Sequence, residues 1–141
     1  MQIDSLSDLI CFGVLPAVTV YAAAHGALYA ALAAGLYVLA ALIRLAWFNV
    51  DEEERQDTDN GQREMYLGLP VTTAALFLPT VLGLARLLHG PLPILGTALL
   101  VVMALAFLIP FKLAKPRLPG MILMILMGCA ELVIVFLGVK P

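Results

Sequence analysis

Two carboxylates stand four residues apart near the start of the sequence, in the stretch Asp4-Ser-Leu-Ser-Asp8. On a helix this spacing places both side chains on one face, one turn apart. The residues that follow are almost entirely apolar, and carboxylates beside an apolar segment are costly unless they face a partner or a wet cavity. A divalent cation would satisfy both, because hard cations prefer oxygen ligands. The spacing therefore predicts a cation site at Asp4 and Asp8.

A purely structural role explains the same two residues. Asp and Ser before an apolar run are ordinary helix N-cap residues, and acidic side chains are favourable near the positive end of a helix. The spacing alone leaves both interpretations open.

The composition indicates an integral membrane protein, so membrane-spanning helices must position Asp4 and Asp8. Of 141 residues, 62% are hydrophobic and only 13% are charged, which is far from the average for soluble domains. Five stretches are apolar over roughly the twenty residues needed to cross a bilayer, namely 4–24, 27–48, 66–88, 92–112 and 118–139. We therefore expect a single all-α domain over residues 1–141, a polytopic transmembrane helix bundle. The net charge of -2 argues against nucleic-acid binding.

The first two expected spans should pack as a hairpin. Only the His25-Gly26 turn separates them, and so short a connection makes the helices antiparallel neighbours. In the second span, Ala27, Ala31 and Gly35 recur every four residues. This spacing predicts close contact with another helix.

The second span ends in a pattern that could bind an anion, Arg44-Leu-Ala-Trp-Phe-Asn49. A cation lies one turn inside the boundary and is followed by aromatic residues of the interfacial type. Arg44 can extend toward the lipid headgroups, or its planar guanidinium can bind a phosphate or a carboxylate. The sequence leaves both roles open.

Basic residues are distributed unevenly between the two ends of the expected bundle. Six lie at the end that carries Asp4 and Asp8, and two lie at the other. The six are Arg44, Arg55, Arg63, Lys112, Lys115 and Arg117, and the two are Arg86 and Lys140. Because short cytoplasmic loops are rich in Lys and Arg, we expect the carboxylates at the cytoplasmic side.

Three motifs at this end resemble the CDP-alcohol phosphatidyltransferases, and in particular their phosphatidylserine synthase branch. The stretch from Asp4 to Asp8, with Phe12-Gly13 and Pro16 after it, is similar to the second half of the signature D-x2-D-G-x2-A-R-x8-G-x3-D-x3-D. The Arg44–Asn49 string and the segment Tyr66-Leu-Gly-Leu-Pro70 are similar to further parts of that branch. The motifs follow the family order and cover most of the chain.

The resemblance implies a reaction and a set of site residues. An alcohol hydroxyl attacks the lipid-bearing phosphorus of a CDP-linked lipid, and CMP leaves. The branch implies CDP-diacylglycerol and serine as substrates and Mg²⁺ or Mn²⁺ as the cation. Asp4 becomes a metal ligand, Asp8 the base that also touches the metal, and Arg44 and Asn49 substrate-binding residues. Membrane lipid and a second copy of the chain are further expected partners, and a bacterial or archaeal cell membrane is the expected location.

The first half of the signature, D-x2-D-G-x2-A-R, does not occur in the 141 residues. We therefore expect an N-terminally truncated enzyme that by itself releases little CMP. Two other hypotheses stay open: a related transferase that uses glycerol phosphate or inositol phosphate, and a non-catalytic membrane scaffold or transporter fragment. Glu131, inside the last expected span, is a candidate by its position, but a hydrogen bond to a neighbouring helix explains it more simply.

Overall fold

The computed structural model describes residues 2–58, 65–67, 70–87, 90–109, 112–114, 126, 128–130 and 133. In chain order its elements are α1 (Gln2–Asp8), the π-helical turn η1 (Leu9–Val14), α2 (Leu15–Ala23), α3 (Leu28–Thr58), β1 (Met65–Leu67), the 3-10 turn η2 (Val71–Thr73), α4 (Ala74–Leu87), α5 (Leu92–Leu108) and β2 (Lys112–Ala114).

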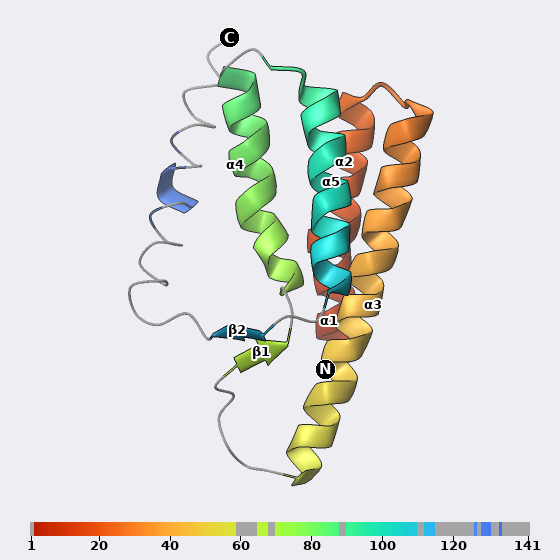
Figure 1. Cartoon of the computed structure of the whole chain (residues 1–141), viewed down its shortest axis with the longest axis vertical. Coiled ribbons are helices and arrows are strands. Elements are labelled where there is room, and N and C mark those ends of the chain that lie inside the picture. Colours follow the sequence, from red (N-terminus) through yellow and green to blue (C-terminus); the bar gives the residue numbers. More distant parts are fainter. Residues whose placement is uncertain are drawn as a thin grey trace.

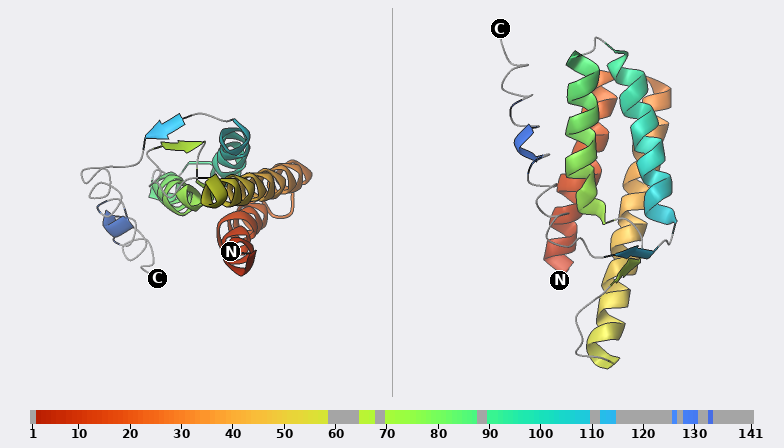
Figure 2. Two further views of the ribbon diagram at one scale, coloured as in Figure 1. Left: turned by 90° about the horizontal axis from the view of Figure 1, so that it is seen from below. Right: turned by 60° about the vertical axis from the view of Figure 1, so that its left-hand side comes forward.

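The described helices pack side by side as an antiparallel bundle (Figure 1). α1, η1 and α2 form one continuous rod, and α3, α4 and α5 follow in alternating directions. The C-terminal end of α3 extends past the rest of the bundle, beyond α1 and the two short strands (Figure 2). The predicted helical bundle is therefore confirmed, and α1 lies beside α3 at one end of it.

The core lies where α2, α3 and α5 meet. The largest fully buried side chains are Val20, Tyr37 and Leu100, one from each of these helices. Large apolar side chains such as Leu28 and Val102 are instead exposed on the outer surface. An extensive apolar exterior is a liability in water, so this distribution suits a hydrocarbon environment.

Among the residues that the structure describes, two helical segments are long and apolar enough to cross a membrane, Ile3–Ala23 and Leu28–Glu53. The apolar helices Val71–Arg86 and Leu92–Leu108 are shorter. The expected span at 118–139 lies largely outside the described residues. The number of five spans consequently stays a prediction.

A pair of short strands departs from the all-α prediction. β1 pairs with β2 in antiparallel register, with Met65 opposite Ala114 and Leu67 opposite Lys112. Proline explains why helix gives way to extended chain here. Ile109 precedes a proline in the sequence and has ψ 118, because a proline ring pushes the preceding residue out of the helical region. The helix expected at 92–112 ends early for this reason. The helix expected at 66–88 begins only after β1 and after Pro70, which is extended with ψ 140.

The predicted turn between α2 and α3 is confirmed and involves two left-handed residues. His25 has φ 52 and Gly26 has φ 77. The Gly26 N–H donates to the Tyr21 carbonyl at 3.2 Å, and the His25 N–H donates to the Ala22 carbonyl at 3.0 Å. This pattern of bonds closes the end of α2 and returns the chain antiparallel along it.

Candidate functional site

Both predicted carboxylates lie on α1, one helical turn apart. Asp4 is exposed and Asp8 is half-buried. Because α1 continues directly into η1 and α2, Asp8 lies inside a long rod, and its side chain makes no capping hydrogen bond. A capping role is therefore wrong for Asp8. Asp4 lies in the first turn of α1, where a negative charge is favourable in any case.

Ser5 ties the helix that carries the carboxylates to α3. Its Oγ donates a hydrogen bond to Oδ1 of Asn49 at 2.9 Å. Ser5 stands between Asp4 and Asp8 in the sequence, so this bond brings Asn49 to the part of α1 that carries the carboxylates. The sequence predicted Asn49 as a site residue but did not single out Ser5. A hydroxyl between two aligned carboxylates is the signal that could have found it.

Arg44 lies on α3 between Tyr37 and Asn49 and is packed inside the bundle. It is 8% exposed, and it is the one charged side chain buried among the residues that the structure describes. An arginine that snorkels runs along the lipid-facing surface toward the headgroups, which differs from this burial. Removing a guanidinium from water is costly unless other groups compensate for it, so Arg44 fits a role inside the bundle.

Tyr37 of α3 contacts both η1 and α5, close to the segment that carries the carboxylates. Its hydroxyl donates to the backbone carbonyl of Phe12 at 2.6 Å. Phe12 belongs to η1, the turn that follows Asp8 directly. The aromatic ring packs against Phe107 of α5, with 5.7 Å between the ring centroids and an interplanar angle of 40°. Tyr37 was not predicted as a site residue, although a tyrosine in an apolar span needs a partner for its hydroxyl.

The donor set fits part of a magnesium site. Mg²⁺ in proteins is usually held by one or two carboxylates together with substrate phosphates and water. Asp4 and Asp8 supply two carboxylates on one face. Within the described ranges, no group of three or more His, Cys, Asp or Glu residues is arranged to hold a metal ion. Glu131 and Gly68 lie outside those ranges.

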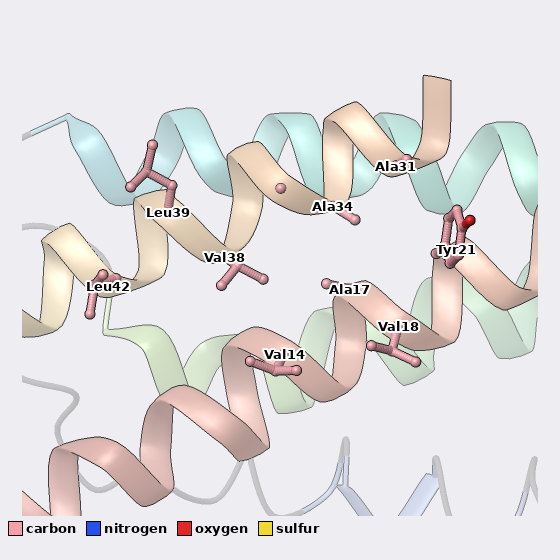
Figure 3. Close-up of a pocket in the computed structure, with 10 residues that line it drawn as sticks. Val14, Ala17, Val18, Tyr21, Ala31, Ala34, Val38, Leu39 and Leu42 are labelled. Carbon is pink, nitrogen blue, oxygen red and sulfur yellow. The ribbon is translucent and has the colours of Figure 1, made fainter. Parts of the chain in front are cut away.

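The small residues of α3 line an open groove. The groove has a volume of about 530 Å³ and runs between α2 and α3 (Figure 3). A Cβ atom on Gly35 would have no other atom within 4 Å, so the predicted close helix contact at Gly35 is wrong for the part of the chain that the structure describes. The groove is lined almost wholly by aliphatic side chains, with Tyr21 at one end. It therefore holds no candidate catalytic group.

Comparison with known proteins finds two curated relatives. The chain is 36% identical over 85 residues to the CDP-diacylglycerol–serine O-phosphatidyltransferase of Saccharomyces cerevisiae, a match that covers 60% of this chain and 30% of the relative. It is 33% identical over 121 residues to the archaetidylserine synthase of Methanothermobacter thermautotrophicus, which covers 85% of this chain and 46% of the relative. The resemblance to the phosphatidylserine synthase branch is confirmed.

The matches to the phosphatidylserine synthase branch are partial. The chain spans less than half the length of each of the two relatives. No protein-family profile matches it, and no solved structure matches it. The two sequences thus support the kind of enzyme, a phosphatidyltransferase, while the roles of the individual residues stay predictions.

Proposed function

We propose that this chain provides part of the active site of a CDP-alcohol phosphatidyltransferase that uses serine as the acceptor. The arrangement of α1 carries the proposal. Asp4 and Asp8 lie on one face of this helix, and Ser5 between them is hydrogen-bonded at 2.9 Å to Asn49 of α3. This places carboxylates and an amide at one end of an apolar bundle, where a lipid-linked nucleotide would meet a polar acceptor.

The names of the two relatives support serine more strongly than a particular lipid. Both enzymes have serine in their names, but one name specifies diacylglycerol and the other specifies an archaetidyl product. We propose CDP-diacylglycerol as the donor and phosphatidylserine as the product. A donor with a different lipid portion is the main alternative that the second relative raises.

The proposed reaction forms one phosphorus–oxygen bond and breaks another. The serine hydroxyl oxygen attacks the phosphorus that bears the lipid. The bond from that phosphorus to the CMP oxygen breaks, and CMP leaves with the electron pair. Asp8 accepts the proton that the serine hydroxyl loses. A general base must lie within hydrogen-bond reach of that proton, and the position of Asp8 on a helix braced by Ser5 suits this requirement.

The remaining residues have binding roles in the proposal. Asp4 and Asp8 would hold Mg²⁺ or Mn²⁺ from adjacent turns of α1. Such a cation, when bound, neutralises the charge of the pyrophosphate and of the departing CMP. The guanidinium of Arg44 suits the carboxylate of serine or a phosphate oxygen, since its planar fork matches both. Asn49 would contribute its amide to the polar substrate.

We also propose that the helices span a bacterial or archaeal cell membrane with this end facing the cytoplasm. The six-to-two distribution of basic residues supports the orientation, because short cytoplasmic loops are rich in Lys and Arg. The pairing of β1 with β2 agrees with it, because residues 65–67 and 112–114 meet at one end of the bundle.

Release of CMP tests the proposal. Membranes that contain this chain joined to an upstream D-x2-D-G-x2-A-R half should release CMP from CDP-diacylglycerol when serine and magnesium are supplied. Serine should be preferred to glycerol phosphate and inositol phosphate, and the 141-residue chain alone should release little. A joined protein that prefers either phosphorylated alcohol would refute the choice of acceptor. If none of the three acceptors supported the release of CMP, the proposed transferase activity would be refuted.

A further inference from the structure

Pro16 removes a hydrogen-bond donor from the rod that carries the carboxylates. In a regular α-helix the N–H at position 16 would donate to the Phe12 carbonyl, but proline has no N–H and its ring presses on that carbonyl. The helix widens ahead of the proline. The Leu15 N–H donates to the carbonyl of Ile10, five residues earlier, which is the bond of a π-helix. The turn η1 is thus a consequence of Pro16.

The structure places a replacement donor at the carbonyl that Pro16 leaves without its helical partner. The Tyr37 hydroxyl donates to the Phe12 oxygen at 2.6 Å. Tyr37 is fully buried, and the contact of its ring with Phe107 holds the side chain from the α5 side. The chain packs against α3 at the next residue as well, since a Cβ atom on Gly13 would lie in ordinary van der Waals contact, 3.5 Å, with the Cβ of Ala41.

The form of η1 determines which face of α1 meets α3. Successive residues of an α-helix are rotated by roughly 100°, so the one extra residue of a π turn rotates everything before it by about that angle. In the observed form Ser5 reaches Asn49 at 2.9 Å. With a regular helical turn in place of η1, the face that carries Ser5 would point elsewhere.

We propose that Tyr37 is a positioning residue. By its bond to the Phe12 carbonyl it holds η1 in the π form and so fixes the rotation of Asp4 and Asp8 relative to α3. The significance of this rotation for catalysis rests on the proposed function, whereas the rotation itself can be measured without substrate or metal. A purely structural role for Tyr37 would weaken the whole bundle, while a positioning role affects α1 selectively.

Cross-linking of introduced cysteines measures the rotation. In the full chain, with Cys11 and Cys129 replaced by alanine, the pair Ser5→Cys and Asn49→Cys reports the position of α1. This pair also removes the native Ser5–Asn49 bond, so the contribution of Tyr37 is isolated. The pair Met65→Cys and Ala114→Cys, which are opposite each other in β1 and β2, reports the integrity of the fold. The shortest bis-methanethiosulfonate reagent is applied to membranes.

The two pairs should respond differently to Tyr37→Phe, which keeps the ring and removes only the donor. We expect the initial rate at the 5–49 pair to fall by about two- to tenfold, the range over which the loss of one hydrogen bond changes an equilibrium constant. The 65–114 pair should keep its rate. Tyr29→Phe, at an exposed position of the same helix, is the matched control and should leave both rates unchanged.

A second variant changes the proline of this turn instead of the tyrosine. Pro16→Ala restores the N–H that can donate to Phe12 and favours a regular helix, so it should also slow the 5–49 pair without loosening the bundle. Equal rates in Tyr37→Phe and Tyr29→Phe would overturn the inference. So would an equal fall at both pairs, an unchanged 5–49 rate in Pro16→Ala, or no cross-link at 5–49 in the parent. Absence of CMP release refutes only the proposed function.

Discussion

Asp4 and Asp8 lie on the same helix, but they differ in exposure and should differ in role. In a protein that carries both halves of the signature, Asp8→Asn keeps the shape of the side chain and removes the proton acceptor. We expect the rate of CMP release to fall by about 10²–10⁴ while donor binding survives. Asp4→Asn should instead weaken the dependence on magnesium, and a higher magnesium concentration should recover part of the activity.

A magnesium titration of both variants separates the possible roles. Glu53→Gln, at an exposed position farther along α3, serves as the control and should behave as the parent does. Asn is itself a good capping residue, so a structural role at Asp4 predicts a loss of only a few tenths of a kcal/mol of stability and a normal rate. Near-normal rates in both variants would end the catalytic interpretation of this stretch.

Single residues were only partly predictable from sequence. The spacing of Asp4 and Asp8 is enough to align them once a helix is assumed. The hydrogen bonds from Ser5 to Asn49 and from Tyr37 to Phe12 are not predictable in this way. The two residues of each pair are far apart in the sequence, and they meet only because α1 and η1 pack against α3. Arg44 was ambiguous for a similar reason, since burial depends on which face of α3 the other helices cover.

The packing of the helices depends on glycine at one crossing more than at another. A Cβ atom at Gly96 of α5 would lie 3.2 Å from both γ carbons of Val20 and 3.3 Å from a δ carbon of Leu82. Gly96→Ala should therefore overpack the junction of α2, α4 and α5 and destabilise the protein by about 1–3 kcal/mol. The midpoint of thermal unfolding in detergent micelles measures this change.

Gly35→Ala is the matched control for Gly96→Ala. Both glycines lie inside helices, but within the described part of the chain a Cβ atom at Gly35 would meet nothing within 4 Å beyond its own stretch of helix. Alanine is favoured over glycine in a helix by roughly 0.5–1 kcal/mol, so Gly35→Ala should keep or raise the midpoint. If Gly96→Ala unfolded at the parent's midpoint, the close approach of α5 to α2 would be contradicted.

Among the elements, the long helices were predictable and their irregularities were not. Hydropathy located the first two spans, and the His25-Gly26 pair located the turn between them. The π turn η1 was missed because periodicity does not reveal a single extra residue, although Pro16 marks where one is needed. The strands β1 and β2 were missed because three residues each are too short for alternation to be recognised, and they pair with each other across the intervening α4 and α5.

At the scale of the whole molecule, the pairing of β1 with β2 joins two segments whose side of the membrane was inferred separately. The run 51–65 leads into β1, and the basic cluster 112–117 begins with β2. Because Met65 lies opposite Ala114, both segments must share one side of a membrane. The orientation inferred from the six basic residues therefore applies to the two segments together, and a single experiment tests both.

Labelling of single cysteines in intact cells tests that orientation. With Cys11 and Cys129 replaced, Gln56→Cys and Ala114→Cys should react with a membrane-impermeant maleimide only after lysis, because the end of the bundle that carries most of the Lys and Arg residues stays on the cytoplasmic side. His25→Cys, in the turn at the opposite end of α2, should react in intact cells. Reaction of Gln56→Cys and Ala114→Cys in intact cells, with His25→Cys protected, would reverse the orientation and remove Asp4 and Asp8 from the cytoplasmic side. If only one of the two positions reacted in intact cells, residues 56 and 114 would lie on opposite sides, which the pairing of β1 with β2 does not permit.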